Sequence, residues 1–320
     1  MSSGSVKADV LVVGELNMDL ILSGLLQFPE MGKEILADGM TLGMGSSSAI
    51  FASNLSVMGV PVRFAGKVGA DSFGDHIVSE LSARGVDTRF IIRDELPTGM
   101  TVALSYLDDR AMVTFPGAMN ALKESDVTDE MLRGAGHLHV SSLFLQPGLR
   151  PGLVRLLSRA RQMGLTTSVD PQWDPAGQWD LDWGKMLPLV DVFLPNGAEI
   201  TGITGKKDWR EALEVLKGTA GTIVIKNGRQ GATLWSGDVL LQQPAFLHEA
   251  VVDTIGAGDS FDAGFVSGLV AGRSLAECLE LGAVCGAINT TAAGGTAAFK
   301  DRGQLARTGL DQFNYRFHDL

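Results

Sequence analysis

Hydrophobic positions along this chain follow two periods that alternate from one end to the other. Short continuous apolar runs, typical of strands buried on both faces, end at Gly, Asn or Asp, as in DVLVVG at residues 9–14. Runs with helical spacing that stop at a glycine lie between them. The pattern predicts strands over residues 9–14, 62–69, 137–142, 166–170, 190–196 and 222–228, and helices over residues 49–59, 73–86, 150–164 and 208–220.

Strand–helix–strand repetition of this kind forms a mainly parallel sheet with helices on both faces, so the predicted fold class is α/β. Residues 17–41 and 98–115 break the rhythm, because they look like alternating strands joined by turns without helices. We therefore expect an α/β core made of residues 1–16, 42–97 and 116–320. The two exceptional segments are expected to form a small β lid at one end of it.

Composition limits the classes of partner. The net charge of -11 argues against non-specific binding to nucleic acid or to an anionic membrane. Gly14 and Glu15 interrupt the first apolar patch, and no apolar run approaches the roughly 18–20 residues that span a bilayer. Cys278 and Cys285, seven residues apart, are interpreted as small core residues in a reducing compartment. These features predict a cytoplasmic protein.

The stretch VVDTIGAGDSFDAGF, residues 251–265, carries the clearest chemistry. Gly256, Ala257 and Gly258 lie where a strand turns into a helix, so their backbone N–H groups and the helix dipole can hold an anion. Asp259 directly behind them would act as a general base on a hydroxyl group, while the amides stabilise a transferring phosphoryl group. An N-capping aspartate after a glycine turn is the alternative that this stretch leaves open.

This string closely resembles the signature of the ribokinase-like (PfkB) carbohydrate kinases, and the resemblance extends over essentially the whole chain. VVGELNMDL resembles the family's first strand, LGMGSSSAIFASNLSVMG its sugar-binding turn and helix, LPNGAEI its Asn-x-x-Glu motif and IKNGRQGA its nucleotide loop. The resemblance implies a ribokinase-like, Rossmann-type sandwich. It also implies an ATP-dependent, Mg²⁺-requiring kinase that phosphorylates a hydroxyl of a small sugar or sugar-like acceptor.

On the donor side, the resemblance makes Asp259 the base and Gly256–Gly258 the anion hole. Lys226 either reaches a phosphate or is a surface lysine at a strand end, and the stretch around Glu199 alone would read as a helix start. The residues implied to bind ATP are Asn196, Glu199 (also near Mg²⁺, through water), Lys226, Gly228, Gly231 and Asn289. The family often binds a monovalent cation such as K⁺, and the matching positions are Asp253, Ile255, Asn289, Ala292, Gly294 and Ala298.

On the acceptor side, the resemblance assigns Asp19, preceded by Asn17, to the sugar hydroxyls. Several other positions depart from the family pattern, which speaks against ribose as the preferred acceptor, because a site built for hydroxyls discriminates strongly. These departures are Gly45-Ser46 in place of Gly-Gly, Ile50 in place of an asparagine and Gln146 in place of a glutamate. The stretch SVDPQWDPAGQW resembles fructokinase-type members, but Gln172 stands where an asparagine is typical.

The lid segments are expected to close over the acceptor and, as in the family, to pair two subunits into a homodimer. A nucleoside kinase of the same fold is the first alternative, with Phe115 or Phe144 stacking on the base; a catalytically idle sensor is the second. Trp173 and Trp179 are interpreted mainly as loop packing, and the His137–His139 pair as packed or hydrogen-bonded histidines rather than metal ligands. No G-x-x-x-x-G-K-[ST] motif occurs, which excludes a P-loop kinase.

Overall fold

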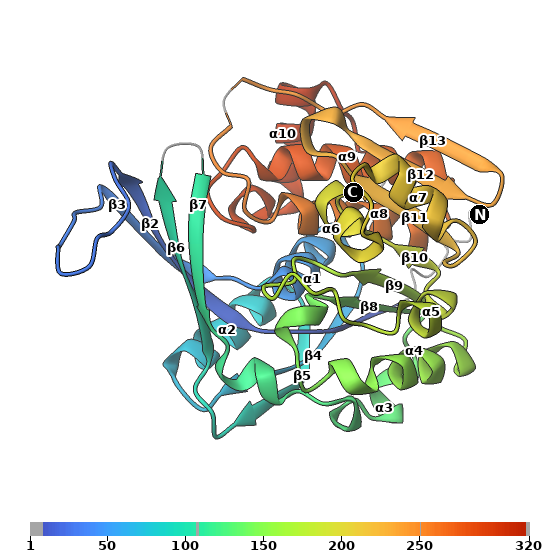
Figure 1. Cartoon of the computed structure of the whole chain (residues 1–320), viewed down its shortest axis with the longest axis horizontal. Helices are drawn as coiled ribbons and strands as arrows, with labels where there is room; N and C mark the ends of the chain where they lie inside the picture. Colours follow the sequence, from blue (N-terminus) through green and yellow to red (C-terminus); the bar gives the residue numbers. More distant parts are fainter. Residues whose placement is uncertain (1–8, 107–108, 250, 318–320) are drawn as a thin grey trace.

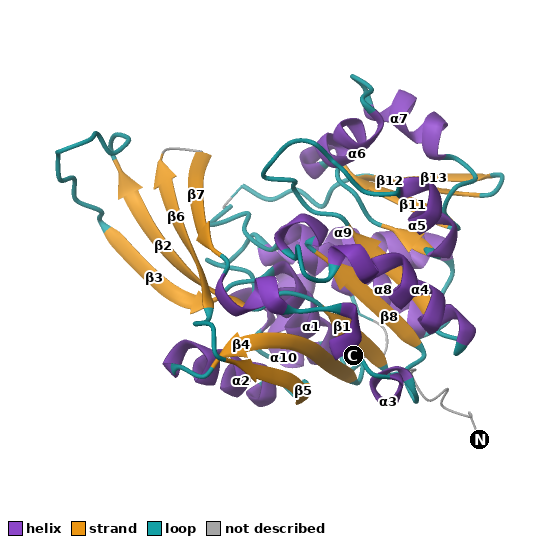
Figure 2. Cartoon of the chain, turned by 60° about the horizontal axis from the view of Figure 1, so that its bottom comes forward, coloured by secondary structure: helices purple, strands orange, loops and turns teal. Residues whose placement is uncertain are grey.

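The computed structural model describes residues 9–106, 109–249 and 251–317, and it contains two sheets (Figure 1). Parts of the predicted core segment 1–16 and of the predicted lid segment 98–115 lie outside the described residues. The chain folds as a large helix-covered sheet from which the small sheet projects at one end (Figures 1 and 2).

The large sheet has the strand order β13-β12-β11-β10-β9-β8-β1-β4-β5. Its strands are β1 (Val10–Val13), β4 (Val62–Gly69), β5 (Asp87–Asp94), β8 (His137–Ser141), β9 (Thr166–Asp170), β10 (Val192–Phe193), β11 (Thr222–Lys226), β12 (Ala232–Ser236) and β13 (Val239–Gln243). Pairing is parallel from β5 to β11, and β12 and β13 are added antiparallel at one edge. The predicted mainly parallel α/β sheet is confirmed.

Helices cover both faces of this sheet because its central strands are apolar on both sides. In β1, Leu11 and Val13 join the cluster with α4, whereas Val10 and Val12 join the cluster with α1. One face carries α1 (Ser47–Val57), α2 (Ser72–Ala83), α8 (Ala257–Val270) and α9 (Leu275–Asn289), with α10 (Arg302–Phe313) packed on α9. The other carries α3 (Asp129–Leu132), α4 (Leu153–Gln162), α5 (Trp183–Met186), α6 (Gly197–Thr204) and α7 (Trp209–Leu216). No helix in the described part of the chain is both long and apolar enough to cross a membrane.

The small sheet consists of β2 (Asn17–Leu25), β3 (Gly39–Met44), β6 (Gly99–Tyr106) and β7 (Asp109–Phe115), in the order β3-β2-β6-β7. β2 and β6 pair in parallel, and the two outer strands pair antiparallel to them. The predicted β lid is confirmed, although β3 continues past the expected boundary at residue 41 to Met44.

Two predicted details are corrected. The strand expected over residues 190–196 is only Val192–Phe193, because Pro195 has no N–H for a ladder bond and Asn196 already caps α6. The edge strands β5 and β13, and β12 beside β13, were not predicted at all. Cys278 and Cys285 are buried free thiols of α9, as expected for core residues.

Candidate active site

The turn before α8 has a geometry that requires glycine. Gly256 adopts φ 76° and is the N-cap of the helix. A Cβ atom there would lie 2.5 Å from the Cα atom of Gly295. The Ala257 N–H donates to the Thr254 carbonyl oxygen at 3.3 Å, and Gly258 follows it in the first turn of α8, where N–H groups have no intrahelical partners. The glycine turn therefore leaves no large side chain at this corner.

Asp259 lies in the first turn of α8 and is 6% exposed. Because the N-cap is Gly256, the alternative in which Asp259 caps the helix is wrong. Gln172 Nε2 donates to Asp259 Oδ1 at 2.9 Å. Burial, and then the nearby carboxylate of Asp170, raise the pKa of Asp259 to about 7. A carboxyl group with such a pKa is suited to general base catalysis near neutral pH.

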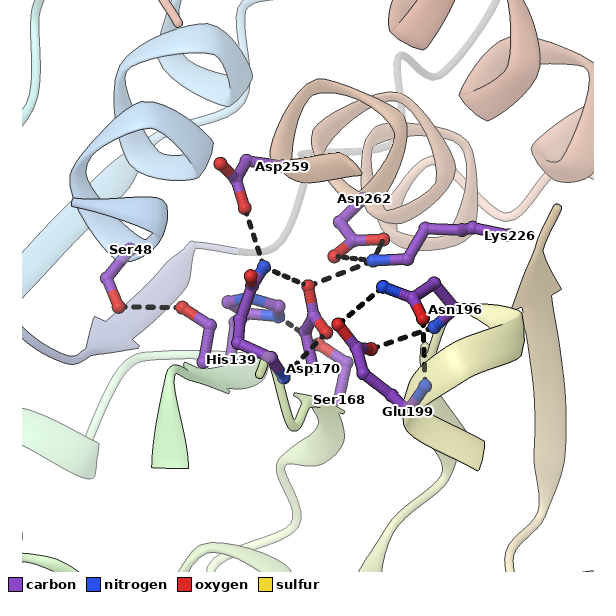
Figure 3. Close-up of polar contacts among 11 residues, drawn as sticks. Ser48, His139, Ser168, Asp170, Asn196, Glu199, Lys226, Asp259 and Asp262 are labelled. Carbon is purple, nitrogen blue, oxygen red and sulfur yellow. Dashed lines mark hydrogen bonds and ion pairs between the residues drawn. The ribbon is translucent and has the colours of Figure 1, made fainter. Parts of the chain in front are cut away.

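Lys226 is paired with two buried carboxylates beneath this corner (Figure 3). Its Nζ atom lies 2.9 Å from Asp170 Oδ2 and 3.0 Å from Asp262 Oδ2, and its side chain is 11% exposed. The interpretation as a surface lysine is therefore wrong. Asp170 and Asp262 were missed, although Asp170 ends a predicted strand and Asp262 follows Asp259 by one helical turn.

Asn196 and Glu199 form a reciprocal cap at the start of α6. The Asn196 N–H donates to Glu199 Oε2 at 2.8 Å, and Asn196 Nδ2 donates to Oε1 at 2.6 Å. Burial, and then Asp170, raise the pKa of Glu199 to about 8. A backbone bridge joins Asn196 to Lys226, so the cap lies beside the ion pairs. Asn196 and Glu199 therefore start a helix, as the stretch alone predicts, and they also lie next to the candidate site.

The side chains near Glu199 limit the ways in which Mg²⁺ could bind. No group of three or more His, Cys, Asp or Glu side chains that could hold a metal occurs among the described residues. A dedicated cage of protein ligands is therefore not a feature of this region. Mg²⁺ usually keeps several waters and binds one or two carboxylates together with substrate phosphates, and a single buried Glu199 is compatible with that mode.

The positions matched to a monovalent cation lie around the same turn. Asp253 accepts from the Ile255 N–H at 2.9 Å and from the Gly294 N–H at 2.8 Å. Asn289 Nδ2 donates to the Ile255 carbonyl oxygen at 2.6 Å. These bonds bring together four of the six predicted positions. The side chains of Ala292 and Ala298 pack in the neighbouring hydrophobic cluster of α9.

On the acceptor side, a hydrogen-bonded row crosses the lid. Asn17 Nδ2 donates to Asp19 Oδ1 at 3.1 Å and to Thr101 Oγ1 at 2.9 Å, and Thr101 Oγ1 lies 3.0 Å from Thr114 Oγ1. Burial raises the pKa of Asp19 to about 6. A Cβ atom at Gly45 would lie 2.1 Å from Asp19 Oδ1, so this glycine allows the carboxyl group its place. The two threonines were not predicted.

The remaining acceptor candidates have different surroundings. Ser46, with φ 72°, caps α1 by accepting from the Ala49 N–H. Ile50 is buried, and its Cγ2 atom would lie 3.2 Å from a Cβ at Gly256, so it packs beneath the glycine turn. Gln146 is fully buried and donates to the Ser141 carbonyl oxygen at 2.6 Å. Its Oε1 atom accepts no hydrogen bond within the described part of the chain.

A pocket of about 460 Å³ adjoins the predicted nucleotide loop. Its lining residues are Arg229, Leu247, His248, Glu249 and Val251. Gly228 and Gly231, on either side of Arg229, have φ 54° and 88°, which glycine adopts without strain.

Three signals are resolved as packing. His137 and His139 are buried and both bond to Ser168 Oγ, at 2.7 and 2.8 Å, which confirms the hydrogen-bonded interpretation. Phe144 packs edge-on against Trp179, with ring centroids 5.4 Å apart. Trp173 also packs edge-on against Trp179, with ring centroids 5.5 Å apart, and it remains 58% exposed.

Comparison with known proteins shows the family and the fold of this chain. The model of the pfkB family carbohydrate kinases matches residues 7–302. A 2-dehydro-3-deoxygluconokinase of Bacillus subtilis is 29% identical over 82% of this chain and 86% of its own length. The solved ribokinase of Arabidopsis thaliana, complexed with ribose and ATP, has a TM-score of 0.81 and 23% identity, covering 96% of this chain and 99% of that chain. An E. coli structure in complex with ATP and Mg²⁺ has a TM-score of 0.79 and 23% identity, covering 92% and 96%.

Proposed function

Because this chain belongs to the pfkB family of carbohydrate kinases and is a phosphotransferase, we propose that it transfers a phosphoryl group from ATP to a hydroxyl of a small sugar or sugar-like acceptor. One observation carries this proposal. The buried carboxyl group of Asp259 lies directly behind the glycine turn at Gly256, in the first turn of α8.

The chemistry follows from that arrangement. Asp259 takes the proton of the acceptor hydroxyl while the hydroxyl oxygen bonds to the terminal phosphorus of ATP. The bond between this phosphorus and its bridging oxygen breaks, and ADP leaves. The N–H groups of Ala257 and Gly258 and the α8 dipole stabilise the negative charge of the transferring group. In the phosphoryl-transfer transition state there is little other covalent work for the protein, so positioning and electrostatics supply the rate.

ATP is proposed to lie along the loop of Gly228 and Gly231, with its base in the pocket lined by Arg229 and Leu247. When bound, Mg²⁺ would neutralise phosphate charge, and Glu199 beside Asn196 would hold it through water. Lys226 and Asn289 remain proposed nucleotide contacts. The positions around Asp253 and Ile255 are proposed to bind K⁺ through backbone carbonyl groups.

The acceptor is proposed to lie between the lid and Asp259, where Asn17 and Asp19 read its hydroxyls. Lid strands have a polar row and an apolar row because successive side chains of a strand point to opposite faces. Asp19, Thr101 and Thr114 stand in register on one face. On the opposite face the row Leu42–Leu20–Val102–Val113 is in register, and Val113 is 69% exposed.

An exposed apolar sheet face of this kind is typical of an interaction surface. We propose that it pairs with the same face of a second copy, so that two lids make a homodimer. A cytoplasmic location, in keeping with the two free cysteines, belongs to the same proposal.

A nucleoside acceptor is the second candidate. Phe115, at the end of β7, is 55% exposed but shares the face of Val113, opposite Thr114, and Phe144 is already enclosed by tryptophans, so neither ring favours this candidate. An idle sensor is disfavoured by the intact Asp259 and its open glycine turn.

The test measures ADP release with Mg·ATP and K⁺ against pentoses, hexoses, sugar acids, sugar phosphates and nucleosides. One strong acceptor-dependent signal that disappears in Asp259→Asn is the expected result. Tight ATP binding without any acceptor-dependent turnover would contradict the kinase and favour the sensor.

A further inference from the structure

Gln172 lies between the two carboxylates at the centre of the site. Its Nε2 atom donates to Asp259 Oδ1 at 2.9 Å and to Asp170 Oδ2 at 2.7 Å. Because a side-chain amide nitrogen carries two hydrogens, this bridge uses both of them. Gln172 follows β9 in a left-handed conformation, φ 57°, which non-glycine residues rarely adopt. Strained backbone of this kind is often kept where a side chain must be aimed.

The surroundings explain why a neutral donor is needed there. The charged groups that face Asp259 from the neighbouring elements are Asp170 of β9, Lys226 of β11, Glu15 after β1 and Glu199 of α6. Asp262 lies one turn further along α8. Lys226 is already paired with Asp170 and Asp262. The Ser47 side chain lowers the pKa of Asp259, and the amide of Gln172 donates a hydrogen bond to this carboxyl group, which lies among other acids.

We propose that Gln172 is a positioning residue for the transfer reaction, whose carboxamide fixes the orientation of the Asp259 carboxyl group and separates it from Asp170. This role rests on the proposed function, since it assigns a partner to the base of that reaction. Two carboxylates that share a site repel each other, and one of them then holds a proton. A donor to the ionised form favours ionisation, which keeps Asp259 able to accept the acceptor's proton.

Two substitutions separate the parts of this role. Gln172→Met keeps the length of the side chain and removes both donors, whereas Gln172→Glu keeps the shape and adds a third carboxylate. Gln178 lies exposed on the same loop, so Gln178→Met and Gln178→Glu are matched controls. Thermal unfolding shows whether each variant folds. If Gln172→Met does not fold, Gln172→Glu still tests the role of Gln172.

With an acceptor from the panel, both Gln172 variants should lower kcat roughly 10- to 100-fold with little change in the KM for ATP, as expected when a charged group loses a hydrogen bond. The acidic limb of the pH profile of kcat/KM should move to higher pH, because both changes favour the protonated form of Asp259. The Gln178 variants should match the wild type. Folded Gln172 variants with the wild-type kcat and acidic limb would overturn the role.

A second measurement needs no acceptor. In protein labelled with ¹³C at the aspartate Cγ, the Asp259 resonance is identified by its loss in Asp259→Asn. Its titration midpoint should rise in both Gln172 variants and stay unchanged in both Gln178 variants. An unchanged midpoint in the Gln172 variants would contradict the bridge. If no acceptor turns over with the wild type, the kinase proposal fails, while this titration still decides whether Gln172 acts on Asp259.

Discussion

Lys226 and Asp262 form a buried ion pair, with Nζ 3.0 Å from Oδ2, that ties the end of strand β11 to helix α8. The same ammonium group holds Asp170 at the end of β9. Strands β9 and β11, which lie on either side of β10, and the helix that carries Asp259 are thus joined at one cation. Because both carboxyl groups are almost fully buried, burial penalises their charged forms, and the ammonium group of Lys226 offsets that penalty.

Replacing Lys226 by Met should therefore destabilise the protein. Removing one partner of a buried pair leaves an uncompensated charge, which lowers the free energy of unfolding by about 3–5 kcal/mol. Urea unfolding at pH 7 measures the loss. The control is Lys185→Met, because Lys185 is 74% exposed in its pair with Asp182. Adding Asp262→Asn to Lys226→Met should restore part of the stability, and equal losses for the two lysine variants would contradict a structural role of the ion pair.

Asp259→Asn should abolish most turnover while ATP still binds. General base catalysis contributes a factor of roughly 10²–10⁴ to the rate, so kcat should fall by a factor in this range. Acceptor-dependent ADP release measures kcat, and calorimetric titration measures ATP binding. Asp180→Asn, at an exposed loop position, is the control. A parallel loss of ATP affinity would mean that Asp259 supports the fold of the turn instead.

The same variant should be more stable than the wild type at alkaline pH. Since the folded-state pKa of Asp259 is about 7 and the ordinary value is 3.8, the folded protein holds a proton that the unfolded chain has already lost. Wild-type stability therefore falls as the pH rises between these values, by roughly 4 kcal/mol at most. Urea unfolding of Asp259→Asn should show a larger gain at pH 8 than at pH 5. A gain that is equal at the two pH values would argue against burial of the carboxylate as its cause.

Val113→Asp should weaken the proposed homodimer. Val113 is 69% exposed on the apolar face of the lid, and a charge in the centre of an interface costs enough to raise the dissociation constant at least about tenfold. Light scattering after size exclusion gives the molar mass. Val215→Asp, at a residue of α7 that is 50% exposed, should leave the mass unchanged. A monomeric wild type would rule out the lid pairing.

Much of the fold could be predicted because buried strands such as β1 are continuous apolar runs with a glycine directly after them. The edge strands β5 and β13 escaped, since an edge strand is half exposed and lacks a continuous apolar run. β10 was overestimated, because sequence hydrophobicity does not show where Pro195 ends the pairing.

At the site, the residues of one contiguous stretch, from Asp253 to Asp259, could be placed from the sequence. The hydrogen-bonded bridge from Asp170 through Gln172 to Asp259 could not be predicted, because it joins the loop after β9 to the start of α8. Only the alignment of β9 and β11 at their carboxyl ends brings Asp170 and Lys226 together. Lys226 illustrates the limit: its position was clear, but its partners depend on the tertiary structure.

The parallel pairing of β2 with β6 also bears on how the chain folds. Between these two strands the chain passes through α1, β4, α2 and β5, all of which belong to the core. A contact that closes so long a loop loses chain entropy before it gains any bonds. The lid is therefore expected to assemble only after this part of the core is in place. A newly made chain would acquire its acceptor-binding surface as one of the last steps of folding.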